Sequence, residues 1–146
     1  MNDKKIQGTL RLKNFKAPLV EMKISKQNEI EFQPNFSLTI QNLRFLNSVN
    51  AFGINFKINL ISQNSQSEEW VSIKVEYHAI FECDSEITDE FLESSFVRIS
   101  APAIGFPYVR SFISNITLQA GIPPVILPSI NFVQFNQEAI ETATEE

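Results

Sequence analysis

Two long segments in which apolar and polar side chains alternate constrain this fold more than anything else in the sequence. In FGINFKINLI, residues 52–61, every second side chain is apolar, and the residues between them are mostly polar. WVSIKVEYHAIFEC, residues 70–83, repeats the pattern. A period of two is typical of a strand with one buried face. Because only a short polar segment, SQNSQSEE, joins the two, the sequence predicts an antiparallel hairpin.

The same period occurs twice more, in residues 20–25 and in residues 36–41, where apolar residues again alternate with polar ones. Together the four segments predict a four-stranded antiparallel sheet with one apolar face. Such a face is stable only when another layer covers it, so the last third of the chain should provide that cover.

The signals in the last third are those of helices. Thr88 is a good N-cap and is followed by two acidic residues, which a helix favours in its first turn. Pro102 should end or kink that helix. Pro107 suits the first position of a second helical run, and Gly121 suits its C-cap. The prediction is therefore a long kinked helix packed on one face of the sheet.

After the helix comes an apolar segment, residues 122–132, whose prolines favour an extended chain. Its apolar side chains either pack in the core or form a surface that touches another apolar chain, and the residues alone leave both open. A short helix is expected from about Gln134, followed by an acidic tail from about residue 141 that should be flexible. Residues 1–146 then make a single α+β domain.

Composition excludes several functions. A net charge of −5 and a pI of about 4.9 argue against nucleic-acid binding, which needs a basic face. No apolar segment is long enough for a signal peptide or a membrane span, so no membrane insertion is expected. The chain has one cysteine, Cys83, which cannot form an internal disulfide, so the expected location is the reducing cytoplasm.

The sequence offers no catalytic constellation. His78, the only histidine, falls on the polar face of its strand and is predicted to be a surface residue. Cys83 lies five residues away and therefore on the opposite face, so the two cannot act as a pair. One histidine and one cysteine are too few for zinc, and four glycines are too few for a phosphate loop. The carboxylates after the hairpin are interpreted as a hydrated turn: Asp84, Glu86, Asp89 and Glu90. We expect no enzyme, metal or cofactor.

One region has a specific counterpart. FPYVRSFISNITLQAGIPPVILPSINF, residues 106–132, resembles the most distinctive region of the SecB protein-export chaperones. There a Phe-Pro-Tyr and a nearby basic residue open the long helix, a glycine follows it, and an apolar crossover ends in Pro-x-x-Asn-Phe. The matching residues here are Phe106, Pro107, Tyr108, Arg110, Gly121, Pro128, Asn131 and Phe132. FQPNFSLTI, residues 32–40, and the order of the elements also match, so the resemblance covers most of the chain.

The resemblance implies an ATP-independent holdase that binds unfolded precursor polypeptides in apolar grooves and passes them to the SecA export motor. It also implies a cytoplasmic homotetramer built as a dimer of dimers. By position, the groove would be lined by Phe32, Phe36, Leu38 and Ile40, and covered by Val125, Ile126 and Leu127. The chain departs from the family at Lys74 and Val75, where acidic residues that face SecA would be expected, so the chaperone surface is better supported than the SecA partnership.

Two other functions compete with a general export chaperone. The first is a dedicated SecB-like chaperone or adaptor for one partner, such as an antitoxin. The second is an α+β domain that binds a small apolar ligand in its interior.

Overall fold

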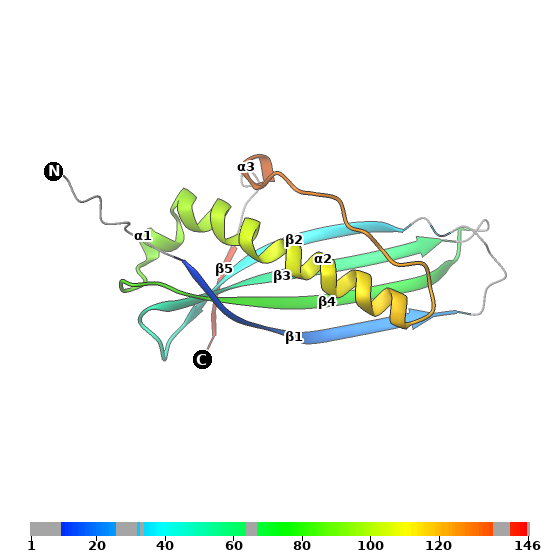
Figure 1. Ribbon diagram of the computed structural model, residues 1–146, viewed down its shortest axis with the longest axis horizontal. Helices are drawn as coiled ribbons and strands as arrows, with labels where there is room; N and C mark the ends of the chain where they lie inside the picture. Colours follow the sequence, from blue (N-terminus) through cyan, green and yellow to red (C-terminus); the bar gives the residue numbers. More distant parts are fainter. Residues whose placement is uncertain (1–9, 26–31, 33, 64–66, 136–140, 146) are drawn as a thin grey trace.

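A mainly antiparallel sheet with one layer of helix forms the described part of the chain, which comprises residues 10–25, 32, 34–63, 67–135 and 141–145 of a computed structural model (Figure 1). The strands are β1 (Arg11–Ile24), β2 (Asn35–Phe45), β3 (Ala51–Gln63), β4 (Glu69–Glu82) and β5 (Glu141–Glu145). The helices are α1 (Asp89–Leu92), a π-helical turn η1 (Phe96–Ser100), α2 (Ala101–Gln119) and α3 (Phe132–Phe135). The strand order is β1-β4-β3-β2-β5.

The predicted hairpin is confirmed, and its register places the alternating apolar residues together. Phe52 of β3 lies opposite Phe81 of β4, and Phe56 lies opposite Tyr77. Their side chains share the face of the sheet that α2 covers, which we call the inner face. Ile40 of β2 pairs with Phe56, so Phe36, Leu38 and Ile40, which alternate along β2, lie on this face too. The predicted fold of four antiparallel strands, a long helix and a short helix is present.

Some polar residues on the outer face of the sheet are buried, although the sequence pattern predicts that this face is exposed to water. His78 is only 5% exposed, so its predicted surface position is wrong. Its strand β4 lies between β1 and β3, where Lys16 and Asn55 are its neighbours in register. Asn55 is itself buried and donates a hydrogen bond of 2.9 Å to Glu76. His78 is therefore a buried polar residue in the middle of the sheet, with a strand on each side of its own.

The helical layer begins as predicted and then differs. The Thr88 hydroxyl accepts a hydrogen bond of 3.0 Å from the backbone of Phe91, which confirms the N-cap. However, α1 lasts only four residues, and α2 runs without interruption from Ala101 to Gln119, with Pro102 in its first turn and Pro107 inside it. The predicted helix start at Pro107 is therefore wrong. Pro107 removes one hydrogen bond, to the carbonyl of Ala103, and burial of one side of α2 on the sheet offsets that loss.

The end of α2 has the predicted glycine geometry. Gly121 has φ +84°, a left-handed conformation that glycine adopts without strain. Its N–H bonds the carbonyl of Leu118 at 3.2 Å, and the N–H of Ile122 bonds that of Thr117 at 3.3 Å. This pair of bonds is the Schellman motif, which ends the helix and turns the chain back.

The segment after α2 has no helix or strand through residue 131, and we call residues 122–131 the crossover. The predicted short helix is present as α3, which starts at Phe132, slightly before the predicted start, because the Asn131 side chain accepts hydrogen bonds from the backbone of Val133 at 3.0 Å and of Gln134 at 3.4 Å. Residues 141–145, which the sequence analysis placed in a flexible tail, form β5 parallel to β2. This strand is not among those predicted from the sequence.

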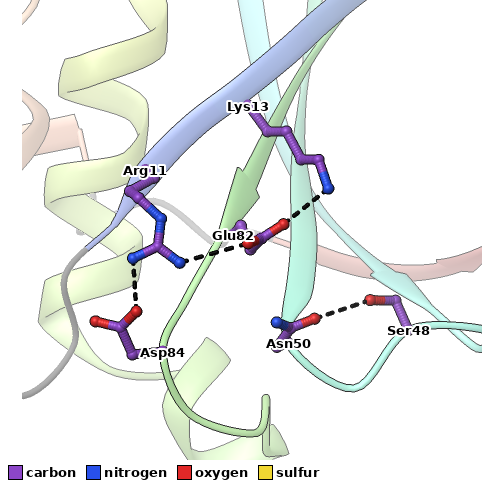
Figure 2. A network of polar contacts seen from close by, with 6 residues as sticks. All are labelled: Arg11, Lys13, Ser48, Asn50, Glu82 and Asp84. Carbon is purple, nitrogen blue, oxygen red and sulfur yellow. Dashed lines mark hydrogen bonds and ion pairs between the residues drawn. The ribbon is translucent and has the colours of Figure 1, made fainter.

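A polar network joins the start of β1 to the end of β4 (Figure 2). Lys13 binds Glu82 at 2.8 Å, and Arg11 binds Glu82 at 3.4 Å and Asp84 at 2.5 Å. The hydrogen bond from Lys13, followed by that from Arg11, lowers the pKa of Glu82. Asp84, predicted to lie in a hydrated turn, is thus exposed and ion-paired. Since these side chains are exposed, the network fixes the register of β1 more than it stabilises the fold.

Candidate functional site

The sequence-predicted groove residues of β2 lie on the inner face but differ in burial. Phe36 and Leu38 are half-buried and pack at the margin of the core, whereas Ile40 is only 2% exposed and belongs to the core itself. Phe32, just before β2, is half-buried and meets Trp70 edge-on, with 5.7 Å between ring centroids. Phe32, Phe36 and Leu38 are therefore the residues of this set that keep exposed apolar surface.

The crossover residues point in alternate directions. Val125 and Leu127 are 5% and 1% exposed and pack in the core, while Ile126 between them is 70% exposed. As extended chain alternates its side chains, the crossover covers the core with one set and presents Ile126 to the outside. Figure 1 shows the crossover leading back from the end of α2 to α3.

Helix α2 holds the crossover in place through two polar side chains. The Thr117 hydroxyl accepts a hydrogen bond of 2.9 Å from the backbone of Val125, and Arg110 Nε donates one of 2.9 Å to the carbonyl of Leu127. The sequence motif includes Arg110 but gives it no such role, and Thr117 is not among the predicted functional residues. A threonine on the buried side of an apolar helix was the available signal, because a buried hydroxyl needs a partner.

A hollow of about 170 Å³ lies between α2 and the end of the crossover. Its lining residues are Ala103, Phe106, Pro107, Arg110, Ser129, Ile130 and Phe132. The buried ring of Phe106 packs on Phe56 of the sheet, with centroids 6.1 Å apart, and on Phe132, with centroids 5.6 Å apart. The motif residues Phe106 and Phe132 thus fasten α2 and α3 to each other and to the sheet. Pro107, Tyr108 and Pro128 are exposed.

A second apolar surface lies along β1 and the adjoining side of α2. Phe15, Val20 and Ile24 of β1 and Tyr108 of α2 are all exposed. Phe15 and Tyr108 contact each other with ring centroids 4.7 Å apart. Burial raises the pKa of the neighbouring Tyr77. This surface belongs to an edge strand that has a partner on only one side, and we call it the β1 surface.

Cys83 and the acidic residues form no reactive centre. Cys83 is buried, and burial raises the pKa of its thiol, which disfavours the reactive thiolate. Within the part of the chain that the structure describes, no three His, Cys, Asp or Glu side chains are grouped to hold a metal ion. Among the described residues, no helix is both long enough and apolar enough to cross a bilayer.

Comparison with known proteins gives a consistent result. The family described as preprotein translocase subunit SecB matches residues 12–143. An uncharacterized protein of Methanocaldococcus jannaschii is 41% identical over 85 residues, which are 58% of this chain and 54% of that protein. The protein-export protein SecB of Dinoroseobacter shibae is 30% identical over 90 residues, or 61% and 51% of the two chains. The match thus spans about half the length of these two relatives.

Two further comparisons cover more of the chain. The protein-export protein SecB of Afipia carboxidovorans is 24% identical over 136 residues, which are 91% of this chain and 79% of that protein. Among solved structures, the SecB-like chaperone of Mycobacterium tuberculosis in complex with a peptide from an antitoxin has the same fold. Its TM-score is 0.67 at 15% identity, over 83% of this chain and 90% of that one.

Proposed function

This chain belongs to the SecB family, and we propose that it is an ATP-independent holdase that captures unfolded polypeptides, including export precursors. The observation that carries the proposal is the apolar margin of the inner face. Phe36 and Leu38 are half-buried on β2, and Ile126 is exposed on a crossover that α2 holds at two points. We place the client on Phe32, Phe36, Leu38 and Ile126, with Ile40, Val125 and Leu127 as the packed base beneath them.

The physical basis is non-directional burial of apolar surface. An unfolded chain exposes apolar side chains, and shallow apolar contacts bind them with little sequence preference. Burying a few hundred Å² contributes roughly 25 cal/mol per Å², part of which the cost of association cancels. Useful affinity therefore needs several such contacts along one chain, and an extended margin on fixed elements provides them without ATP.

SecA is the proposed recipient of the client, and the cytoplasm is the proposed location. Of the two residues at which the sequence departs from the family, Lys74 is exposed on the outer face, while Val75 is buried on the inner face. Contact with SecA through this strand would therefore involve Lys74 and not Val75.

A dedicated chaperone for one partner is the second candidate, because the structural neighbour from M. tuberculosis is seen with an antitoxin peptide. A small-ligand domain fits less well. The hollow beside α2 holds about 170 Å³, below the roughly 300–1,000 Å³ of most small-molecule sites.

We further propose that the β1 surface joins two copies of the chain, in keeping with a dimer of dimers. Edge strands with exposed apolar residues tend to pair, and Phe15, Val20 and Tyr108 would be buried by a second copy. Replacing Val20 and Tyr108 together with lysine should lower the mass measured by light scattering, because a dimer of dimers that loses one of its two interfaces separates into smaller assemblies. An unchanged mass for the folded variant would refute this interface.

The holdase proposal is tested by diluting a chemically unfolded protein into buffer and following its aggregation by light scattering. We expect this chain to suppress aggregation without ATP, because the client's apolar residues bind to the margin of the inner face. An excess of a natively folded protein should not compete. If aggregation proceeds unchanged, the general holdase function is wrong, and a pull-down that returns one stoichiometric partner would favour the dedicated chaperone.

A further inference from the structure

A hollow of about 280 Å³ lies on the outer face of the hairpin that β3 and β4 form, and we call it the hairpin hollow. In one row of the register Lys57 lies opposite Glu76, and in a neighbouring row Asn59 lies opposite Lys74. These four side chains form the rim of the hollow, and they alternate with the buried apolar residues of the inner face. Because Asn59 and Lys74 are exposed, a partner in solution can reach the rim.

The charged residues of the rim differ in their partners. Lys57 Nζ lies 4.0 Å from Glu76 Oε1, and the same oxygen accepts a hydrogen bond of 2.9 Å from Asn55. Glu76 is therefore already engaged by two side chains of its own sheet. Among the described residues, no carboxylate lies within ion-pair distance of Lys74, although Glu21 is its neighbour in register on β1. Two lysines and one glutamate leave the hairpin hollow with a net positive charge.

The surrounding part of the outer face is also basic. Between the rows that contain Ser72 and His78, all of which the structure describes, β1 adds Lys16, Glu21 and Lys23 to this face. With the rim of the hollow, these rows contain four lysines and two glutamates, whereas the whole chain has a net charge of −5. A basic area on an acidic protein directs an acidic partner to one place, because the rest of the surface repels it.

The spacing of the two rim lysines matches the spacing of side chains along an extended peptide. Lys57 and Lys74 are diagonal neighbours on adjacent antiparallel strands, which separates their Cβ atoms by about 7 Å. Side chains two residues apart in an extended chain lie on the same side at about the same separation. Carboxylates at alternate positions can therefore reach both lysines at once, whereas carboxylates of adjacent residues point to opposite sides.

We propose that the hairpin hollow is a docking site for an extended acidic segment of a partner protein, in which two carboxylates separated by one residue bind Lys57 and Lys74. Asn59 lies beside both lysines on the rim, and its amide offers hydrogen bonds to the backbone of that segment. The inference goes beyond the holdase function and does not depend on it, because the client is placed on the inner face. A chain that holds a client can thus bind this acidic partner on its opposite face.

The test uses two labelled peptides of the same composition, rich in glycine and serine, that differ only in the order of their residues. In one peptide two aspartates are separated by a serine, and in the other they are adjacent. Fluorescence anisotropy gives the Kd of each peptide for the wild type and for the double variant Lys57→Gln, Lys74→Gln. We expect the wild type to bind the alternate-aspartate peptide about threefold more tightly, a ratio typical of one additional exposed ion pair, and added salt should reduce that ratio. The double variant should bind both peptides equally.

The double variant Lys16→Gln, Lys23→Gln is the matched control, because it removes two lysines from the same face but none from the rim. It should weaken both peptides slightly and keep the wild-type ratio. Comparing two peptides on one variant also separates the charge from structural damage, which would weaken both peptides alike. Equal binding of the two peptides to the wild type, or a ratio that persists without Lys57 and Lys74, would overturn the docking site. Displacement of the peptide by an equal concentration of inorganic phosphate would overturn it too, because the hollow would then bind anions in general.

Discussion

Replacing Phe36 and Leu38 together with serine is expected to weaken the capture of an unfolded client by about thirtyfold while the protein stays folded. Both side chains are half-buried at the margin of the inner face, so each has apolar surface that a client can still cover. If each contact contributes about 1 kcal/mol, their joint loss is about 2 kcal/mol, which corresponds to that factor. The Kd for a permanently unfolded, labelled client measures the effect directly.

The same strand offers the matched control. Ser37 and Thr39 alternate with the two apolar residues and are exposed on the outer face. Changing both to alanine replaces the same number of residues in β2 but leaves the inner face intact. Capture of the client should therefore remain at the wild-type level. Circular dichroism and thermal unfolding would establish that both double variants are folded. A folded Phe36→Ser, Leu38→Ser variant that captures clients normally would show that the client binds elsewhere.

The strands were predictable because the pattern that specifies them is local. A period of two over ten or more residues describes a strand with one buried face, and β3 and β4 pair in the register that this alternation requires. The caps at Thr88 and Gly121 were also predictable, since a cap is decided by one residue and the backbone next to it.

Features that depend on contacts distant in the sequence were not predictable. The local sequence predicts a helix start at Pro107, yet α2 continues through this residue because its packing on the sheet offsets the lost hydrogen bond. His78 reads as exposed, yet β1 and β3 lie on both sides of it. Nothing near residue 141 indicates that this segment pairs with β2. Tertiary packing overrides local preference at all three positions.

The candidate site also contains residues that the local sequence pattern predicts and residues that it does not predict. Alternation along β2 was enough to put Phe36 and Leu38 on the apolar face. The crossover has no such pattern, so the sequence grouped Val125, Ile126 and Leu127 together, and only the structure separates the exposed Ile126 from its buried neighbours. The bond from Arg110 to Leu127 joins residues 17 apart in the sequence and has no local signal.

Gly105 determines how closely α2 approaches the sheet, and Gly105→Leu is expected to destabilise the protein by about 3 kcal/mol. A Cβ at this position would lie 3.1 Å from two ring atoms of Phe56 and 3.2 Å from the Cβ of Ala79, closer than real contacts normally are. The longer leucine side chain has no space between helix and sheet, so α2 would have to move away from β3 and β4. Urea unfolding measures the loss of free energy.

Two milder variants show whether the close approach is the cause. Gly105→Ala forces its neighbours to shift by only a few tenths of an ångström, and it gains about 1 kcal/mol of helix propensity, so its stability should stay near the wild type. Ala103→Leu adds a leucine on the exposed side of the same helix and should also be tolerated. If Gly105→Leu were as stable as these two variants, the close approach of α2 to the sheet would not require glycine at this position. If it is destabilised as expected, Gly105 holds α2, and with it Arg110 and Thr117, at the distance from which they fix the crossover.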